Sequence, residues 1–332
     1  MAVGIVRRQF ISALGGATVA WPLAARAQQS AMPAIGILGS ESLSSFFEKP
    51  LEAFRDGLGE TGYVVGKNAS IEYRWAEGQR DRLQALAAGL VDRRVAVIVA
   101  VQGSASAIAA KDATTTIPIV FATGGDPVKL GLVASLNNPR GNITGISFLL
   151  NALGAKRLEL LHTLLPDAKV IGLLTNPNNP NSKSEVTDMQ SAARSLRIQL
   201  VIESASNEVE IDSAFVIFAR QSVNGFINTA DVYFNSRYQQ IVALAARYGI
   251  PAIYHSTDFS NAGGLMSYGT SISDAHRLAG VYAGRILRGE KPADLPVQES
   301  VKVELIINLK TAEALGITFP LPLLGRADEV IE

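Results

Sequence analysis

Strand-sized apolar runs alternate with helical patterns along almost the whole chain, and this alternation constrains the fold more than any other feature. Residues 34–38, 95–100 and 119–121 are short apolar runs that end in glycine or polar residues. Each is followed by apolar residues at spacings of three and four, which are typical of an amphipathic helix. Parallel strands joined by helical crossovers give this pattern. The sequence therefore predicts an α/β protein.

The alternation restarts near Leu153 and runs through a second set of similar length. A helical pattern at 156–165 is followed by apolar strands at 170–174 and 225–227. The chain is 48% hydrophobic over 332 residues, which is enough for two cores. We predict two doubly wound, Rossmann-like lobes with a ligand cleft between them.

Residues 1–27 have the three regions of an export signal. Arg7 and Arg8 form a basic start of twin-arginine appearance, and residues 10–20 form an apolar stretch too short to span a bilayer. Residues 25–27 read Ala-Arg-Ala, a typical cleavage site. We expect cleavage after Ala27 and a periplasmic protein, by either the twin-arginine or the general secretion route. The ordered regions disfavour a cytosolic chain with an apolar N-terminal helix.

Composition argues against several classes of function. Lys+Arg 30 equals Asp+Glu 30, so no basic field attracts nucleic acid, and Cys 0 excludes thiolate metal sites and cysteine nucleophiles. His162, His255 and His276 lack the spacing of metal ligands. No nucleophile elbow or lysine-containing phosphate loop occurs. We expect no metal, no cofactor, no catalytic set and no nucleic-acid partner.

Glycine or polar turns follow strand after strand. The carboxyl ends of parallel strands share one edge of a sheet, where open α/β sheets bind ligands. Two such edges would enclose many hydrogen-bonding groups and few strong bases, which suits binding better than proton transfer. The candidate ligand-binding residues from these turns are Ser40, Gly103, Ser104, Ala105, Thr123, Gly124, Asp126, Pro127, Asn176, Asn228 and Asp231.

The segment 118–128 allows two interpretations. Asp126 occupies an N-cap position and Pro127 the first position of a predicted helix that continues to Leu136. The free amides at that helix start could hold an anionic ligand. Alternatively, Asp126 only caps the helix, and Gly124 and Gly125 only make the turn.

Three aromatic residues are candidates for the cleft wall. Tyr73 and Trp75 follow the predicted strand that starts at Ser70, and Tyr268 follows a glycine turn. Trp75 is the sole tryptophan left once the signal with Trp21 is removed. Each ring could stack on a ligand, or it could take part in ordinary packing.

Several stretches resemble one known family. Residues 118–135 (PIVFATGGDPVKLGLVAS), 141–147 (GNITGIS), 262–269 (AGGLMSYG) and 305–316 (LIINLKTAEALG) resemble ABC transporter substrate-binding proteins of the tryptophan/tyrosine-type family, as does the N-terminal RRQFISALGGA. The resemblance covers essentially the whole mature chain. It implies a type I periplasmic binding protein fold with three crossovers, here near 148–153, 251–255 and 296–303. Lobe one would then be residues 33–148 plus 255–295, and lobe two residues 149–254 plus 296–332.

The resemblance implies a periplasmic receptor that closes by hinge motion on a small organic ligand and serves an inner-membrane ABC permease. We expect a monomer whose ligand is an aromatic or other carboxylate, amino acids included. Motif matching adds Asp258 to the cleft positions, and Asp231 or Asp258 could pair with an amine. The alternatives are an exported two-lobed α/β enzyme and the ligand-sensing module of a regulator.

Overall fold

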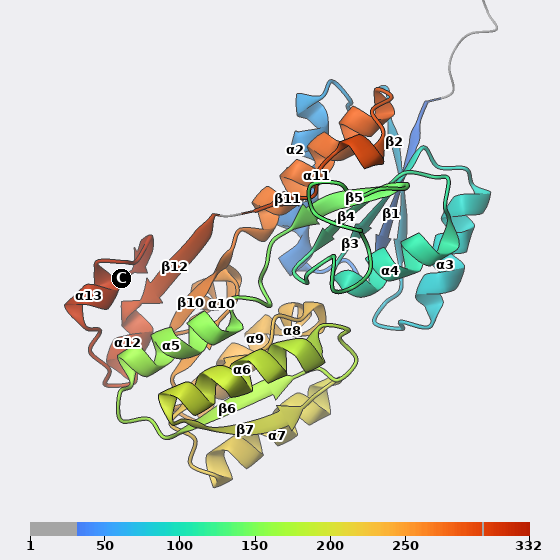
Figure 1. Cartoon of the computed structure of the whole chain (residues 1–332). Coiled ribbons are helices and arrows are strands. Elements are labelled where there is room, and N and C mark those ends of the chain that lie inside the picture. The colour runs from blue at the N-terminus through green and yellow to red at the C-terminus, as the bar shows by residue number, and fades with distance from the viewer. Residues whose placement is uncertain (1–31, 301) are drawn as a thin grey trace, which may run out of the picture. The chain divides into compact units, whose positions relative to one another are not determined.

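The computed structural model describes residues 32–300 and 302–332, and its strands form two separate sheets (Figure 1). The first sheet has the order β11-β5-β4-β3-β1-β2, and the second has the order β13-β12-β10-β9-β8-β6-β7. Helices cover both faces of each sheet, so the predicted α/β class with two doubly wound lobes is confirmed. The export signal predicted for residues 1–27 lies outside the described residues.

Lobe one is built around the first sheet. Its strands are β1 (Ala34–Gly39), β2 (Ser70–Trp75), β3 (Val97–Val101), β4 (Ile119–Thr123), β5 (Ile143–Ser147) and β11 (Gln298–Glu299). Its helices are α2 (Ser45–Glu60), α3 (Arg82–Asp92), α4 (Ser104–Ala113), α11 (Ile272–Leu287) and the short η1 (Pro292–Asp294). All of its strand pairs are parallel. In the order β2-β1-β3-β4-β5 the direction of winding reverses between β1 and β3, which makes that point the topological switch.

Lobe two repeats this arrangement. Its strands are β6 (Val170–Thr175), β7 (Gln199–Ser204), β8 (Gly225–Asn228), β9 (Ala252–Tyr254), β10 (Met266–Thr270), β12 (Val303–Asn308) and β13 (Glu329–Ile331). Its helices are α5 (Gly154–Leu164), α6 (Ser182–Leu196), α7 (Glu208–Arg220), α8 (Val232–Ser236), α9 (Tyr238–Arg247), α10 (Thr257–Asn261), α12 (Leu309–Ala314) and α13 (Leu321–Leu324). The order β7-β6-β8-β9-β10 places its switch between β6 and β8, and β12 pairs antiparallel with β10.

Small residues let α11 pack closely on α2. A side chain at Gly57 would collide with the carbonyl of Arg277, and one at Gly280 would collide with the carbonyl of Phe54. The two helices therefore touch through their backbones, and both contribute buried residues to the same core. This contact joins α11 to lobe one, although α11 follows a strand of lobe two.

The chain passes between the sheets three times, and the second passage differs from the expected one. The first lies between Ser147 and Gly154, and the third between Glu299 and Val303. The second lies at Ser271 rather than at 251–255, because β10 pairs with β9 and extends the second sheet. Residues 255–270, which we expected in lobe one, thus carry α10 and β10 of lobe two. The glycine-rich stretch 262–269 ends in β10, a strand of the second sheet, and its local sequence does not reveal this strand.

The helix predicted after Asp126 is wrong. Residues 127–131 form turns, residues 132–136 are bent or irregular, and Gly131 has a left-handed backbone with φ of 67°. The Leu132 N–H donates to the Pro127 carbonyl at 2.8 Å, so the chain folds back after a single turn. Leu132 is buried in this turn, while Val128 is exposed. The two apolar residues, four positions apart, therefore do not share the buried face of a helix.

No helix in the described ranges 32–300 and 302–332 combines the length and the apolar character that a membrane crossing requires.

Candidate functional site

One pocket lies where the switch points of the two lobes meet. Lobe one contributes the residues that follow β1 and β3, and lobe two contributes those that follow β6 and β8. The residues are Glu41, Ser44, Gly103, Ser104 and Ala105 from lobe one and Asn179, Pro180, Asn181, Ala230, Asp231 and Val232 from lobe two. Both sheets therefore present their switch points to the same space, as expected for a ligand site in this fold class.

One part of the pocket wall is apolar. Phe46 and Phe47 come from the first turn of α2, and Phe148 and Leu150 come from the first passage between the sheets. Ile272 and His276, from the start of α11, complete this part. The rings of Phe47 and His276 meet edge to face with their centroids 5.1 Å apart. Such a wall suits an apolar or aromatic group.

The start of α4 supplies polar groups. Gly103 is the N-cap residue with φ of 96°, a conformation that favours glycine, and no side chain caps this helix. Its first amides, at Ser104 and Ala105, therefore lie at the pocket with the positive end of the helix dipole. Asn181 of lobe two donates from Nδ2 to Ser104 Oγ at 2.9 Å, which links the lobes across the pocket.

Three charged residues lie in the pocket wall. Burial is the largest cause that raises the pKa of Glu41 to about 7, and the negative charge of Asp231 is the second. The positive charges of Arg80 and Arg237 lower this pKa and oppose the shift. Burial also raises the pKa of Asp231, against hydrogen bonds from Asn176 and from the Phe234 amide. Burial lowers the pKa of Arg80. Two carboxyl groups from opposite lobes and one guanidinium thus share a partly desolvated space, where a ligand cation would relieve the repulsion between the carboxylates.

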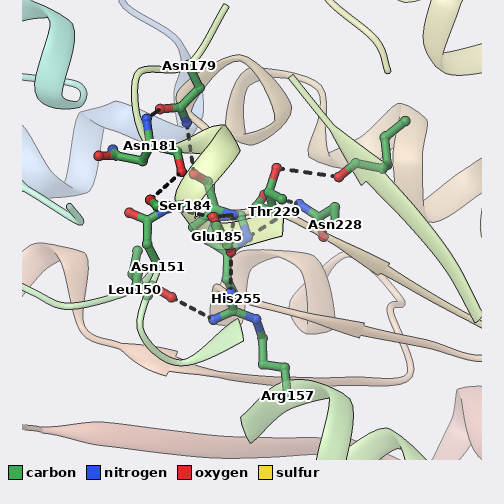
Figure 2. A network of polar contacts seen from close by, with 12 residues as sticks. Leu150, Asn151, Arg157, Asn179, Asn181, Ser184, Glu185, Asn228, Thr229 and His255 are labelled. Carbon is green, nitrogen blue, oxygen red and sulfur yellow. Dashed lines mark hydrogen bonds and ion pairs between the residues drawn. The ribbon is translucent and has the colours of Figure 1, made fainter. Parts of the chain in front are cut away.

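A buried ion pair between Arg157 and Glu185 contacts two segments that contribute to the pocket wall (Figure 2). Arg157 donates from Nη1 to the Leu150 carbonyl at 3.1 Å, and its Nη2 lies 3.0 Å from Glu185 Oε1. Glu185 also accepts from Asn151 Nδ2 at 2.5 Å and from the Ala230 amide at 3.1 Å. The pair therefore links the first passage between the sheets to the loop that carries Ala230 and Asp231. Burial raises the pKa of Glu185 to about 7, while the charge of Arg157 opposes this.

Comparison with known proteins decides the family. The family described as "ABC transporter substrate binding protein" matches residues 45–331. The chain belongs to this family. The type I periplasmic binding protein fold that the sequence resemblance implied is thereby confirmed.

Three known proteins are similar to this chain over most of their length. The tyrosine-binding protein of Clostridioides difficile is 30% identical over 277 residues, which are 81% of this chain and 77% of that protein. A Streptococcus pneumonia domain in complex with L-Trp is 27% identical with a TM-score of 0.79, covering 90% of this chain and 100% of that one. A ligand-free, open substrate-binding protein from Clostridium difficile is 26% identical with a TM-score of 0.65, covering 90% and 99%.

Five of the residues predicted from the sequence lie in the wall of this pocket: Gly103, Ser104, Ala105, Gly124 and Asp231. They follow three different strands, β3, β4 and β8, as the strand-end rule requires. Whether they bind a ligand stays a prediction.

Four further predicted residues are not part of this wall, but each contacts a residue that is. Ser40 Oγ donates to the Gln102 carbonyl at 2.7 Å, and Thr123 Oγ1 lies 2.6 Å from Ser104 Oγ. Asn176 donates to Asp231 Oδ1 at 3.0 Å and lines a wider neighbouring groove. Asn228 is fully buried.

Four of the six remaining predicted residues lie away from this pocket. Asp126 Oδ1 accepts from the amides of Val128 and Lys129 at 2.9 and 3.1 Å, which is a capping arrangement, and Pro127 follows it in the turn. Asp258 lines a separate depression, and Tyr268 packs on the second-lobe core. The expectation that these residues share one site with Ser104 is thus not met by their positions.

The two aromatic candidates of lobe one pack beside the pocket rather than in its wall. The rings of Tyr73 and Trp75 stack with centroids 5.8 Å apart, and Trp75 meets Phe47 at 6.1 Å. The indole lies over Gly39, where a side chain would collide with it. Phe47 therefore lies at the pocket, and Trp75 contacts it from outside.

None of the apolar-wall residues was a candidate from the sequence, and neither were Glu41 and Arg80 of the charged group. Glu41 and Arg80 follow β1 and β2 closely, so the strand-end rule could have found them. Phe47 has helical spacing with Leu51, Phe54 and Leu58, a pattern that predicts only the buried face of a helix. His276 lies on α11, which the resemblance assigned to lobe one within 255–295, but the local sequence does not show which of its residues lie at the pocket. In the part of the chain that the structure describes, no three potential metal ligands gather.

Proposed function

We propose that this ABC transporter substrate-binding protein captures a small amphipathic carboxylate in the pocket between its lobes. It acts in the periplasm as a monomer and delivers the ligand to an inner-membrane permease. The observation that carries the proposal is the pocket itself, which joins both switch points and has an apolar part and a polar, charged part. That division matches a ligand with an apolar body and an ionic end.

The polar part suggests how the ionic end is held. The free amides at Ser104 and Ala105 favour a carboxylate, since the start of a helix carries partial positive charge. Glu41 and Asp231 approach the same space from opposite lobes and favour an ammonium group. An amino acid offers both groups. The names of two relatives, one tyrosine-binding and one in complex with L-Trp, make aromatic amino acids the first ligands to test.

Closure on the ligand follows from the position of the pocket between two lobes. The hydrogen bond from Asn181 to Ser104 joins the lobes in this structure. The TM-score is higher with the L-Trp complex, 0.79, than with the open, ligand-free protein, 0.65, at nearly equal identity. Both observations support an arrangement close to the ligand-bound one. A ligand that touches both lobes would stabilise it relative to the open form.

Calorimetric titration of the mature protein tests the proposal. We expect one molecule of L-tyrosine, L-tryptophan or a related aromatic carboxylate to bind per chain and to be recovered unchanged. At 100 times the dissociation constant, it should stabilise the fold by roughly 2.7 kcal/mol. Asp231→Asn should weaken binding, while the matched change Asp258→Asn in the separate depression should not. Conversion of the ligand to a product would instead favour the exported α/β enzyme.

A further inference from the structure

We propose that His276 selects ligands that carry an O–H or N–H donor at their apolar end over ligands that lack one. The inference rests on the proposed function, because it takes the pocket between the lobes as the ligand site. It concerns the far end of the ligand and is independent of how the ionic end is held.

The protonation of the His276 ring is fixed by its surroundings. Nδ1 lies 2.8 Å from the Ile272 carbonyl one turn earlier in α11, and a carbonyl can only accept. Nδ1 therefore carries the hydrogen. Burial lowers the pKa of His276 to about 4, so the ring is neutral near pH 7. Nε2 is consequently a hydrogen-bond acceptor with a free lone pair.

This acceptor has no partner in the ranges 32–300 and 302–332. Only 2% of His276 is exposed, and its Nε2 is buried without a hydrogen bond. The residue lies in the pocket wall, and the rings of Phe47 and Phe148 are its aromatic neighbours at 5.1 and 6.4 Å. Those rings offer no donor. Because buried acceptors almost always have partners, the geometry points to a donor supplied from the pocket.

His255, the other histidine of the pocket wall, shows the contrast. Its Nε2 lies 2.6 Å from Asn235 Oδ1, and its Nδ1 lies 3.4 Å from Asn228 Nδ2. Both ring nitrogens therefore have neighbours within the protein. The donor that His276 lacks must fit among aromatic rings, which a phenol O–H or an indole N–H does. A plain phenyl ring would leave Nε2 unpartnered.

Ligand pairs that differ by one donor test the inference. We expect the unmodified protein to bind L-tyrosine more tightly than L-phenylalanine by roughly 5- to 100-fold, as measured by calorimetry. His276→Phe should abolish this ratio, because neither amino acid then meets a ring acceptor at this position. His276→Gln, whose amide oxygen can replace Nε2 as acceptor, should restore part of the ratio. His162→Phe, outside the pocket, should leave the ratio unchanged.

The outcomes separate the two proposals. Equal binding of L-tyrosine and L-phenylalanine by the unmodified protein overturns the role of His276 and leaves the receptor function intact. If neither amino acid binds, the aromatic amino-acid ligand is wrong, and p-cresol and toluene then test His276 alone. Nitrogen NMR should show the Nε2 resonance shifting with p-cresol but not with toluene, and no shift with p-cresol overturns the inference. The chain has only three histidines, so single variants assign the signal.

Discussion

Arg157 Nη2 lies 3.0 Å from Glu185 Oε1, and both side chains are completely buried. The pair contacts two segments that lie at the pocket, since Arg157 holds the Leu150 carbonyl and Glu185 holds the Ala230 amide. A buried charge is expensive without its partner, so neither side chain tolerates removal of the other. The pair thus fixes the first passage between the lobes relative to the loop of Asp231.

Breaking this pair should be strongly destabilising. Arg157→Met leaves a buried carboxylate without its cation and should cost roughly 3–5 kcal/mol of unfolding free energy. The double variant Arg157→Met with Glu185→Leu should recover much of that loss. Chemical denaturation measures both. As a control, Glu159→Gln breaks the exposed pair with Lys156 and should cost no more than about 1 kcal/mol. Equal losses at Arg157 and Glu159 would contradict the expectation.

Binding of an amino acid should depend on pH through Glu41. The pKa of this group is about 7 without ligand, because of burial and the charge of Asp231. An ammonium group favours the carboxylate form, so binding below that pKa expels a proton. Affinity should therefore rise with pH up to about 7, by at most about tenfold per pH unit, and then level off.

Calorimetry in two buffers of different ionisation enthalpy measures the expelled proton directly. Glu41→Gln should remove it, whereas Glu77→Gln, at the exposed ion pair with Arg82, should not. An affinity that stays flat from about pH 5.5 to about pH 8 in the unmodified protein would refute the role of Glu41.

Asp126 should matter little for affinity. Its carboxylate accepts from two amides of its own turn and lies outside the pocket wall. Asparagine caps nearly as well, so Asp126→Asn should change both the melting temperature and the dissociation constant only slightly. Asp231→Asn is the matched comparison and should weaken binding of an amino acid by roughly 10- to 100-fold. A comparable loss at Asp126 would show that it touches the ligand.

Trp75 should report binding without contributing to it. Its ring packs against Phe47, which lies at the pocket, so a bound ligand should change the tryptophan emission in a saturable way. Trp75→Phe should keep the dissociation constant within about threefold, while Phe47→Ala should weaken binding by roughly tenfold or more. If Trp75→Phe weakens binding as much as Phe47→Ala, the indole itself contacts the ligand.

The architecture could be predicted because it depends on local pattern. Strand-sized apolar runs and helical spacing identify the α/β class, and polar turns at strand ends include Ser104 and Asp231, which lie in the pocket wall. The helix after Asp126 was predicted wrongly because a capping side chain and apolar spacing also fit a single turn closed by Gly131.

The apolar wall could not be predicted in the same way. Phe148 follows a strand, but its place in the wall depends on where the chain leaves lobe one. His276 reaches the pocket only because α11 returns to lobe one and packs on α2. Such returns depend on contacts between segments far apart in sequence. A local sequence pattern identifies a helix or strand, but it does not identify the distant element on which that helix or strand packs.

The backbone contact between α2 and α11 also determines when lobe one can be completed during synthesis. The ribosome makes α2 early, but Gly280 and the rest of α11 emerge only after β10 of lobe two. Until then, α2 lacks the helix that packs on its backbone at Phe54 and Gly57, and the shared core lacks Ala275, Ala279 and Ala283. A nascent chain that ends before residue 272 therefore exposes apolar surface, however well its first strands have formed, and it is a natural client for a holding chaperone.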